Sequence, residues 1–177
     1  LFTEAEDNTA KLWDINAAAN DNGVVDTPMR TFSGHGGHGG RVTSVFVSGD
    51  RLFTGSADGT AKMWDINATA NDNGVVDTPM HTFSGHNYWV MSVFVSRLDI
   101  GEGEKNYLFT GFYDNTAKMW DADRSSGNFG NEVRTFTGNF DNEVGTFIGH
   151  TTTVYSVFVS GDYLFTGSAD GTAKMWD

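Results

Sequence analysis

The sequence predicts an all-β repeat protein, and three observations lead to this prediction. A segment that ends in Trp-Asp occurs four times along the 177 residues. The runs around it are rich in Val, Phe and Thr, which favour strands, and glycine-containing turns such as Ala-Asp-Gly-Thr separate these runs. No stretch of the chain has a sustained helical period.

The repeated segment aligns without gaps in its four copies. The copies are LFTEAEDNTAKLWD from Leu1, LFTGSADGTAKMWD from Leu52, LFTGFYDNTAKMWD from Leu108 and LFTGSADGTAKMWD from Leu164. The last three follow apolar runs, which are VTSVFVSGD, VMSVFVS and VYSVFVSGD. Each unit therefore reads as four short strands, a (SVFV), b (LFTGS), c (TAKMW) and d (ending in TF). One such unit cannot bury both of its faces, so neighbouring units must stack.

Each unit combines a Gly-His, an Asp in a tight turn and a closing Trp-Asp. This combination resembles the WD40 repeat family, and the resemblance covers nearly the whole chain. It implies a β-propeller, in which four-stranded antiparallel blades surround a central channel. The Trp-Asp pairs begin at 13, 64, 120 and 176, so the period exceeds the roughly 40–45 residues of an ordinary repeat. The excess lies in the c-to-d segments and in residues 97–107, which we expect on one face of the disc.

The strand order predicts about three and a half blades within one propeller segment, residues 1–177. The expected blades are 1–34 (partial), 35–85, 86–149 and 150–177 (partial). This order favours a window on a longer propeller, and self-assembly through open blade edges is the alternative. The third blade offers two candidates for strand d, within 131–139 and 142–150. We favour the second, because it leads directly into a Gly-His.

The resemblance also implies a buried hydrogen-bonded set of His, Thr, Asp and Trp in each blade. Trp only donates, Asp only accepts, and His and Thr relay between them. In the second blade His35 and His38 both fit, and the spacing to the next Trp favours His38. Recurrence of the set beside a Trp favours a scaffold over a catalytic triad, so no catalytic residue is predicted. The predicted members are Thr3, Asp7, Trp13, His38, Thr54, Asp58, Trp64, His86, Thr110, Asp114, Trp120, His150, Thr166, Asp170 and Trp176.

Aromatic residues distinguish the third unit from its copies. Tyr88 and Trp89 stand where the other copies have Gly-Arg and Thr-Thr, and Phe112 and Tyr113 stand where two copies have Ser-Ala. In the family both positions lie toward one face, around the channel mouth. An aromatic cluster there is typical of a binding hot spot, although Phe112 could instead pack between blades. The predicted partner-binding residues are Arg41, Tyr88, Trp89, Phe112 and Tyr113.

The c-to-d segments predict a calcium site as a second hypothesis. Closely spaced Asp and Asn oxygens around a glycine are suitable calcium ligands. The spacing does not match the EF-hand pattern, however, and Asp-Asn-Gly is also a favourable hairpin turn. The candidate ligands are Asp14, Asn16, Asn20, Asn22, Asp26, Asp65, Asn67, Asn71, Asn73 and Asp77.

Composition restricts the class of partner. A formal net charge of −12 disfavours binding to nucleic acid or to anionic membranes. The chain has no cysteine, which excludes disulfides and thiolate metal sites and fits a cytoplasmic protein. We therefore expect a non-enzymatic scaffold or adaptor that binds other proteins or peptides. A structural subunit of a self-assembling oligomer or filament is the alternative, and a calcium-dependent binding module is the third hypothesis.

Overall fold

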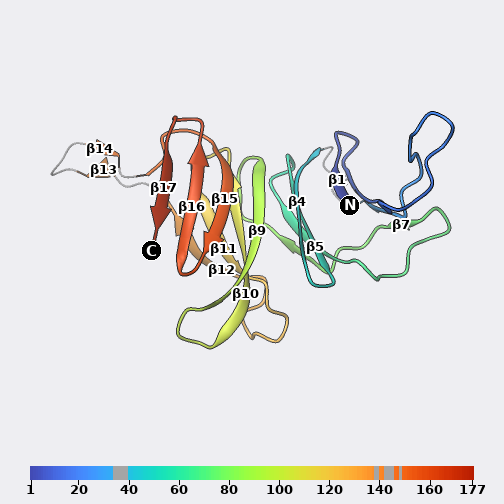
Figure 1. Cartoon of the computed structure of the whole chain (residues 1–177). Helices are drawn as coiled ribbons and strands as arrows, with labels where there is room; N and C mark the ends of the chain where they lie inside the picture. The colour runs from blue at the N-terminus through green and yellow to red at the C-terminus, as the bar shows by residue number, and fades with distance from the viewer. Residues whose placement is uncertain (34–39, 138–139, 142–145, 148) are drawn as a thin grey trace.

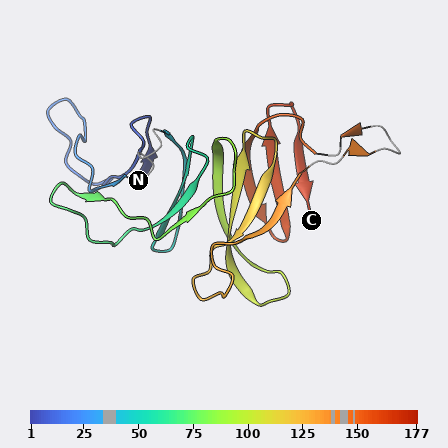
Figure 2. The same cartoon turned by 180° about the vertical axis from the view of Figure 1, so that it is seen from behind.

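The chain folds into successive β-sheets that stack side by side (Figures 1 and 2). The computed structural model describes residues 1–33, 40–137, 140–141, 146–147 and 149–177, and all regular structure in these ranges is β-strand. Three of the sheets have four strands, one has three, and a two-stranded hairpin lies apart from them. No helix in the described ranges is long and apolar enough to cross a membrane. The predicted all-β class is confirmed.

Apart from β7 in the first sheet, the strands of each sheet follow one another in chain order. The first sheet contains β1 (Phe2–Glu4), β2 (Thr9–Leu12), β3 (Arg30–Ser33) and β7 (Val75–Val76), and the second contains β4 (Val42–Ser48), β5 (Arg51–Ser56), β6 (Ala61–Asp65) and β8 (His81–Phe83). The third contains β9 (Val90–Asp99), β10 (Glu104–Phe112), β11 (Ala117–Asp121) and β12 (Glu132–Phe136), and the last contains β15 (Val154–Ser160), β16 (Tyr163–Ser168) and β17 (Ala173–Trp176). The separate hairpin pairs β13 (Phe140–Asp141) with β14 (Thr146–Phe147).

The apolar cores lie between adjacent blades, and the same side chains build each of them. Strands b and c of one blade contribute Phe, Ala and Met, and strand d contributes a second Phe. Strand a of the next blade contributes valines, its strand b a Leu and its strand c the Trp. Between the second and third blades these side chains are Phe53, Ala61, Met63, Phe83, Val90, Val93, Val95, Leu108 and Trp120, all at most 6% exposed. Burial of both faces by neighbours explains why a single unit would be insufficient.

The a strands of successive blades are also joined by hydrogen bonds. The backbone N–H of Val93 donates to Oγ of Ser44 over 3.1 Å, and Val157 N–H donates to Oγ of Ser92 over 3.2 Å. Close approach requires a small residue on strand b. A Cβ at Gly55 would lie 2.7 Å from the Val90 side chain, so only glycine fits there without displacement.

The first sheet gains a strand that the sequence did not predict. Val75 and Val76 belong to the c-to-d segment of the second blade, yet they pair in parallel with β3 of the first blade. Val76 is 3% exposed and joins the core that contains Phe32 and Trp64. This segment therefore covers the edge of β3, which would otherwise present unpaired backbone groups.

The expected strand d of the third blade was wrong. The structure places β12, from the first of the two similar segments, beside β11, and Phe136 pairs with Ala117. Phe136 then packs against Trp176 of the next blade at 6.0 Å between ring centroids. The same contact joins Phe32 to Trp64 at 5.9 Å. Residues 146–147 of the second segment pair with residues 140–141, which precede it, in the hairpin that lies apart from the blade (Figure 1). The shorter connection from β11 brings the first segment to the open edge.

The long connections of the third blade extend from one end of its sheet, as expected. The a-to-b segment continues the ladder as a hairpin, with Asp99 opposite Glu104. The c-to-d segment lies against it, because Ala122 N–H donates to the Asn106 carbonyl over 2.9 Å. In Figure 1 both extend below the sheet.

Candidate partner-binding site

A Trp–Thr hydrogen bond recurs in all four blades and anchors each Trp-Asp pair. The indole N–H of Trp13 donates to Oγ1 of Thr3 over 2.9 Å, and the three later copies of the bond measure 2.8–3.0 Å. Thr54, Thr110 and Thr166 are at most 2% exposed. The threonine chosen in the sequence is thus the one that accepts the indole proton. Two residues after Thr54, the hydroxyl of Ser56 does not bond the indole. It donates instead to the backbone carbonyl of Gly40.

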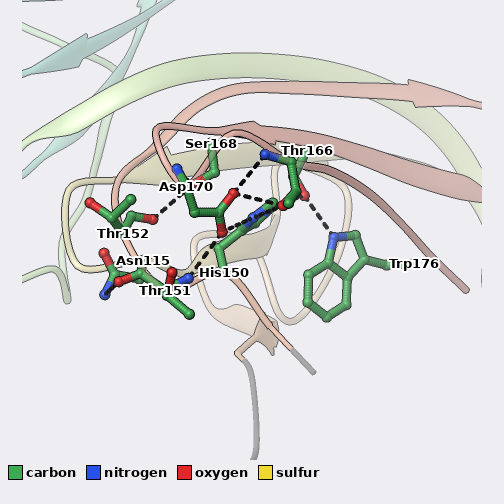
Figure 3. Close-up of polar contacts among 9 residues, drawn as sticks. Asn115, His150, Thr151, Thr152, Thr166, Ser168, Asp170 and Trp176 are labelled. Carbon is green, nitrogen blue, oxygen red and sulfur yellow. Dashed lines mark hydrogen bonds and ion pairs between the residues drawn. The ribbon is translucent and has the colours of Figure 1, made fainter. Parts of the chain in front are cut away.

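The fourth blade contains the whole predicted set. His150 joins Asp170 through Nδ1 at 2.9 Å and Thr166 through Nε2 at 2.7 Å (Figure 3). Thr166 also accepts the Trp176 indole N–H, so its hydroxyl is the centre of the network. Hydrogen bonds from Thr172, and then from His150, hold the pKa of Asp170 well below its usual range. The carboxylate therefore remains an acceptor at neutral pH.

The third blade departs from this prediction. Trp120 donates to Thr110 over 2.8 Å, but Asp114 accepts hydrogen bonds from Thr116. His86 instead stacks on Phe112, and neither of its buried ring nitrogens has a hydrogen-bond partner among the described residues. Burial, together with the nearby charge of Lys118, lowers the pKa of His86 to about 2. The predicted role of His86 as a relay was wrong, because its ring stacks on Phe112 and neither nitrogen forms a hydrogen bond with Thr110 or Asp114.

The first and second blades contain parts of the set. Asp7 accepts hydrogen bonds from Thr9 and pairs with Lys11 at 2.6 Å. Asp58 accepts both the N–H and the hydroxyl of Thr60, at 2.8 and 2.7 Å. The two candidate histidines of the second blade, His35 and His38, lie outside the described residues.

Three exposed aromatic side chains form one surface on the third blade. Tyr88, Trp89 and Tyr113 are 57%, 42% and 52% exposed, and they line a hollow of about 300 Å³. Tyr113 lies between the other two rings, with centroid distances of 6.2 Å to Tyr88 and 6.1 Å to Trp89. We call this surface the aromatic hollow.

Arg41 of the second blade borders the aromatic hollow. Its Cζ lies 5.2 Å from the centroid of the Trp89 ring, and its guanidinium also approaches Glu6 at 3.4 Å. The structure thus brings together Arg41, Tyr88, Trp89 and Tyr113, four of the five predicted residues. The sequence did not single out Glu6, which lies in another blade and carries no motif.

Phe112 does not belong to the accessible surface, so its predicted partner-binding role was wrong. It is fully buried in the core between the second and third blades, which also contains Val90 and Trp120. Phe112 and Tyr113 differ because β10 ends at Phe112, whereas Tyr113 begins the turn that follows and is exposed. Phe112 instead packs between blades, which was the alternative considered for it in the sequence.

The β9–β10 ladder positions the aromatic hollow. Phe112 pairs with Val90, and one residue further the Tyr113 N–H donates to the Trp89 carbonyl over 3.1 Å. The turn of the preceding blade that contains Gly59 lies close to the backbone of Tyr88. Gly59 has a φ of +83°, and a Cβ there would lie 3.3 Å from the Tyr88 carbonyl oxygen. The β9–β10 ladder and the Gly59 turn thus place the backbone on the two sides of the hollow.

The candidate calcium ligands take part in turns. Oδ1 of Asn20 accepts the N–H groups of Asn22 and Val24 at 3.1 and 3.0 Å. Equivalent bonds form at Asn71, and Asp14 and Asp65 accept the N–H two residues on. The described residues contain no group of three or more His, Cys, Asp or Glu suited to a metal ion. Calcium binding by these segments stays a prediction, and the hydrogen bonds assign their oxygens to turns.

Replacement of Thr166 by Val should destabilise the protein more than replacement of Thr110 by Val. Thr166→Val leaves two partners without this hydrogen bond, the buried His150 Nε2 and the half-buried Trp176 indole N–H, whereas Thr110→Val orphans only the Trp120 indole among the ring groups. At about 1–3 kcal/mol for each orphaned group, we expect a loss of about 2–4 kcal/mol for Thr166→Val and about half of that for Thr110→Val. Urea unfolding followed by tryptophan fluorescence measures both, and equal losses would contradict the network.

Acidification should destabilise the protein through His86. The unfolded histidine binds a proton below pH about 6.5, whereas the folded pKa is about 2. The unfolded state therefore binds more protons between these values, and stability falls as pH drops below 6.5. The expected loss is at most about 2 kcal/mol between pH 6.5 and pH 5.

The matched variant is His86→Phe, which keeps a ring on Phe112 and removes both nitrogens. We expect it to raise the free energy of unfolding at pH 7 by about 1–2 kcal/mol. Its unfolding curves should also depend less on pH between 5 and 7. The residual slope belongs partly to His81, whose pKa is also lowered by burial. An unchanged slope would show that His86 is not the responsible group.

Comparison with known proteins agrees with this geometry. The WD domain, G-beta repeat family matches residues 26–65, 77–121 and 141–177, more than half of the chain. A guanine nucleotide-binding protein subunit beta of Arabidopsis thaliana is 29% identical over 173 residues, which cover 97% of this chain and 40% of that protein. The small ribosomal subunit protein RACK1 of Caenorhabditis elegans is 29% identical over 106 residues, 57% of this chain and 31% of that protein. The chain thus spans about two fifths of the length of the subunit beta, and less of RACK1.

Solved structures agree on the fold. The crystal structure of the computationally designed Ika4 protein superposes with a TM-score of 0.65 at 23% identity, and covers 99% of this chain and 82% of that one. The WD40 β-propeller domain of Doa1 gives a TM-score of 0.65 at 22% identity, over 99% of this chain and 46% of that one. The family predicted from the repeated motifs is confirmed. The chain belongs to the WD domain, G-beta repeat family, and its sheets are blades of a WD40 β-propeller.

Proposed function

We propose that the chain is a non-enzymatic scaffold that holds other proteins, and that the aromatic hollow is its contact surface. The observation that carries the proposal is the exposure of Tyr88, Trp89 and Tyr113 together around a backbone hydrogen bond from Tyr113 N–H to the Trp89 carbonyl. Aromatic side chains in a well-formed hollow contribute strongly to binding between proteins.

The similar proteins support a role in assemblies. Two of them are named as parts of larger complexes, a guanine nucleotide-binding protein subunit and a small ribosomal subunit protein. The arrangement of the His, Thr and Asp side chains supports a structural role in the blades. In the fourth blade the Thr166 hydroxyl is buried between His150 and Trp176, where no substrate could reach it.

Panning a peptide display library on the immobilised protein tests this proposal. Trp89→Ala should weaken the binding of the selected peptides by about tenfold or more, as expected for an interfacial hot spot. Tyr155→Ala is the matched control, because Tyr155 is 53% exposed but lies on β15, in the neighbouring blade. Peptides that bind the wild type and Trp89→Ala equally well would place the contact surface elsewhere and contradict the proposal.

Self-association is a second candidate function, and one face of the fourth blade favours it. Phe165 and Met175 are 37% and 62% exposed, whereas their counterparts Phe53 and Met63 are 2% and 1% exposed beneath the next blade. The first blade presents the opposite kind of face, because Leu1 is 65% exposed and lines a hollow with Trp13. A second copy could therefore stack head to tail through the contact that joins the blades.

Sedimentation velocity over a range of concentrations tests this candidate. Wild-type protein should shift to larger species as its concentration rises, and Phe165→Glu should remain at 19.3 kDa because it places a charge in the apolar contact. Val133→Glu provides the control, since Val133 is 40% exposed on β12 and lies outside this face. A wild-type protein that stays at 19.3 kDa throughout would remove self-association as a function.

A further inference from the structure

The chemistry of the aromatic hollow restricts what can occupy it. The described residues that line it are Tyr88, Trp89 and Tyr113, so its walls are ring faces and ring edges and carry no carboxylate. The rings are tilted by 47° and 49° from one another, at centroid distances of 6.2 and 6.1 Å. The faces of such rings carry negative electrostatic potential and attract cations within about 6 Å of a centroid.

The guanidinium of Arg41 already lies over one of these rings, that of Trp89. The guanidinium carbon of Arg41 lies 5.2 Å from the Trp89 centroid, and its other neighbour is the exposed Glu6, at 3.4 Å. Both contacts are at the surface, so neither holds Arg41 firmly. Arg41 could leave Trp89 and keep Glu6, which would free the ring for a second cation.

The charge of the chain also favours a cationic occupant. With 23 acidic and 11 basic residues the formal net charge is −12, which attracts positively charged partners over long range. None of the described residues that line the hollow carries a carboxylate, and this distinguishes between cations. A bare ammonium is strongly hydrated and would lose its water without an ion pair in return, whereas a methylated ammonium is less hydrated and fills an aromatic cage.

We propose that the aromatic hollow takes a methylated lysine side chain of a partner peptide, and that Arg41 competes with this side chain for the Trp89 ring. The proposal rests on the proposed scaffold function and specifies its ligand. The trimethylammonium group would lie between Tyr88, Tyr113 and Trp89, and Arg41 would turn toward Glu6 when it binds.

A pair of small probes separates charge from shape. N-acetyl-trimethyllysine amide carries the cation, and its analogue with a tert-butyl group in place of trimethylammonium has the same shape without charge. Binding to the intact chain is followed by the indole N–H signal of Trp89 in ¹H–¹⁵N spectra, assigned as the signal that Trp89→Phe lacks. We expect the cationic probe to shift this signal and to bind about five- to tenfold more tightly than the neutral one.

Two variants test the geometry. Arg41→Ala should bind the cationic probe several-fold more tightly, because the competing guanidinium is gone, and Tyr113→Ala should bind it several-fold more weakly. Weaker binding of the cationic probe by Arg41→Ala would show that Arg41 helps to form the hollow and does not compete for it, and equal binding of the two probes would show that the hollow is only apolar. Either result overturns the proposal, as does a Trp89 signal that does not move with either probe.

The failure of this inference is distinguishable from failure of the scaffold function. If display peptides require Trp89 but neither they nor the probes show a preference for methylated ammonium, the contact surface stands and its ligand is different. If no display peptide depends on Trp89, the surface itself has been misassigned and both proposals fall.

Discussion

Each of the indole rings of Trp64, Trp120 and Trp176 is held from two directions, and the stacking of the blades depends on this arrangement. Its N–H donates to a buried threonine of the same blade, which fixes the ring in place. Its edge and face pack against the strand-d phenylalanine of the preceding blade, as Phe83 does on Trp120 at 6.0 Å. The same ring is therefore hydrogen-bonded within its own blade and packed against the preceding blade, so it connects the two blades. Phe and Trp also supply much of the apolar area that a blade must bury.

The repeated scaffold allows one blade to vary. Ser56 and Ser168 donate to backbone carbonyls of the segment before strand a, and the third blade has Phe112 at that position. His86 stacks on this Phe112 ring, and neither of its nitrogens has a hydrogen-bond partner among the described residues, which is unfavourable for stability. The adjoining Tyr113 is exposed beside Trp89 and forms the aromatic hollow. The third blade therefore combines a weaker internal network with the most distinctive surface on the described part of the chain. Functional surfaces commonly occur where local consistency is relaxed.

Hydrogen bonding and packing have separate roles in this blade. Thr110 and Trp120 keep their bond, so the position of the indole does not require the histidine. In the fourth blade, by contrast, His150 links Asp170 to Thr166 and ties the turn before β17 to the core. The two blades show that the Trp–Thr bond is the common element and that the histidine relay reinforces it.

The sequence by itself determined the all-β class, the family and the threonine that accepts each indole proton, because these follow from local periodicity and from residues repeated in register. The family resemblance also placed Tyr88, Trp89 and Tyr113 near one another, since the entry to strand a and the b-to-c turn lie toward the same face in that family. Only the tertiary structure decided which of two similar segments becomes strand d of the third blade. That choice depends on which segment reaches the open edge of β11 and the Trp176 ring. Pairing of Val75 with β3, burial of Phe112 and the position of Arg41 over Trp89 likewise depend on contacts between different blades. A single repeat carries no information about such contacts, because the partner lies a whole unit away along the chain.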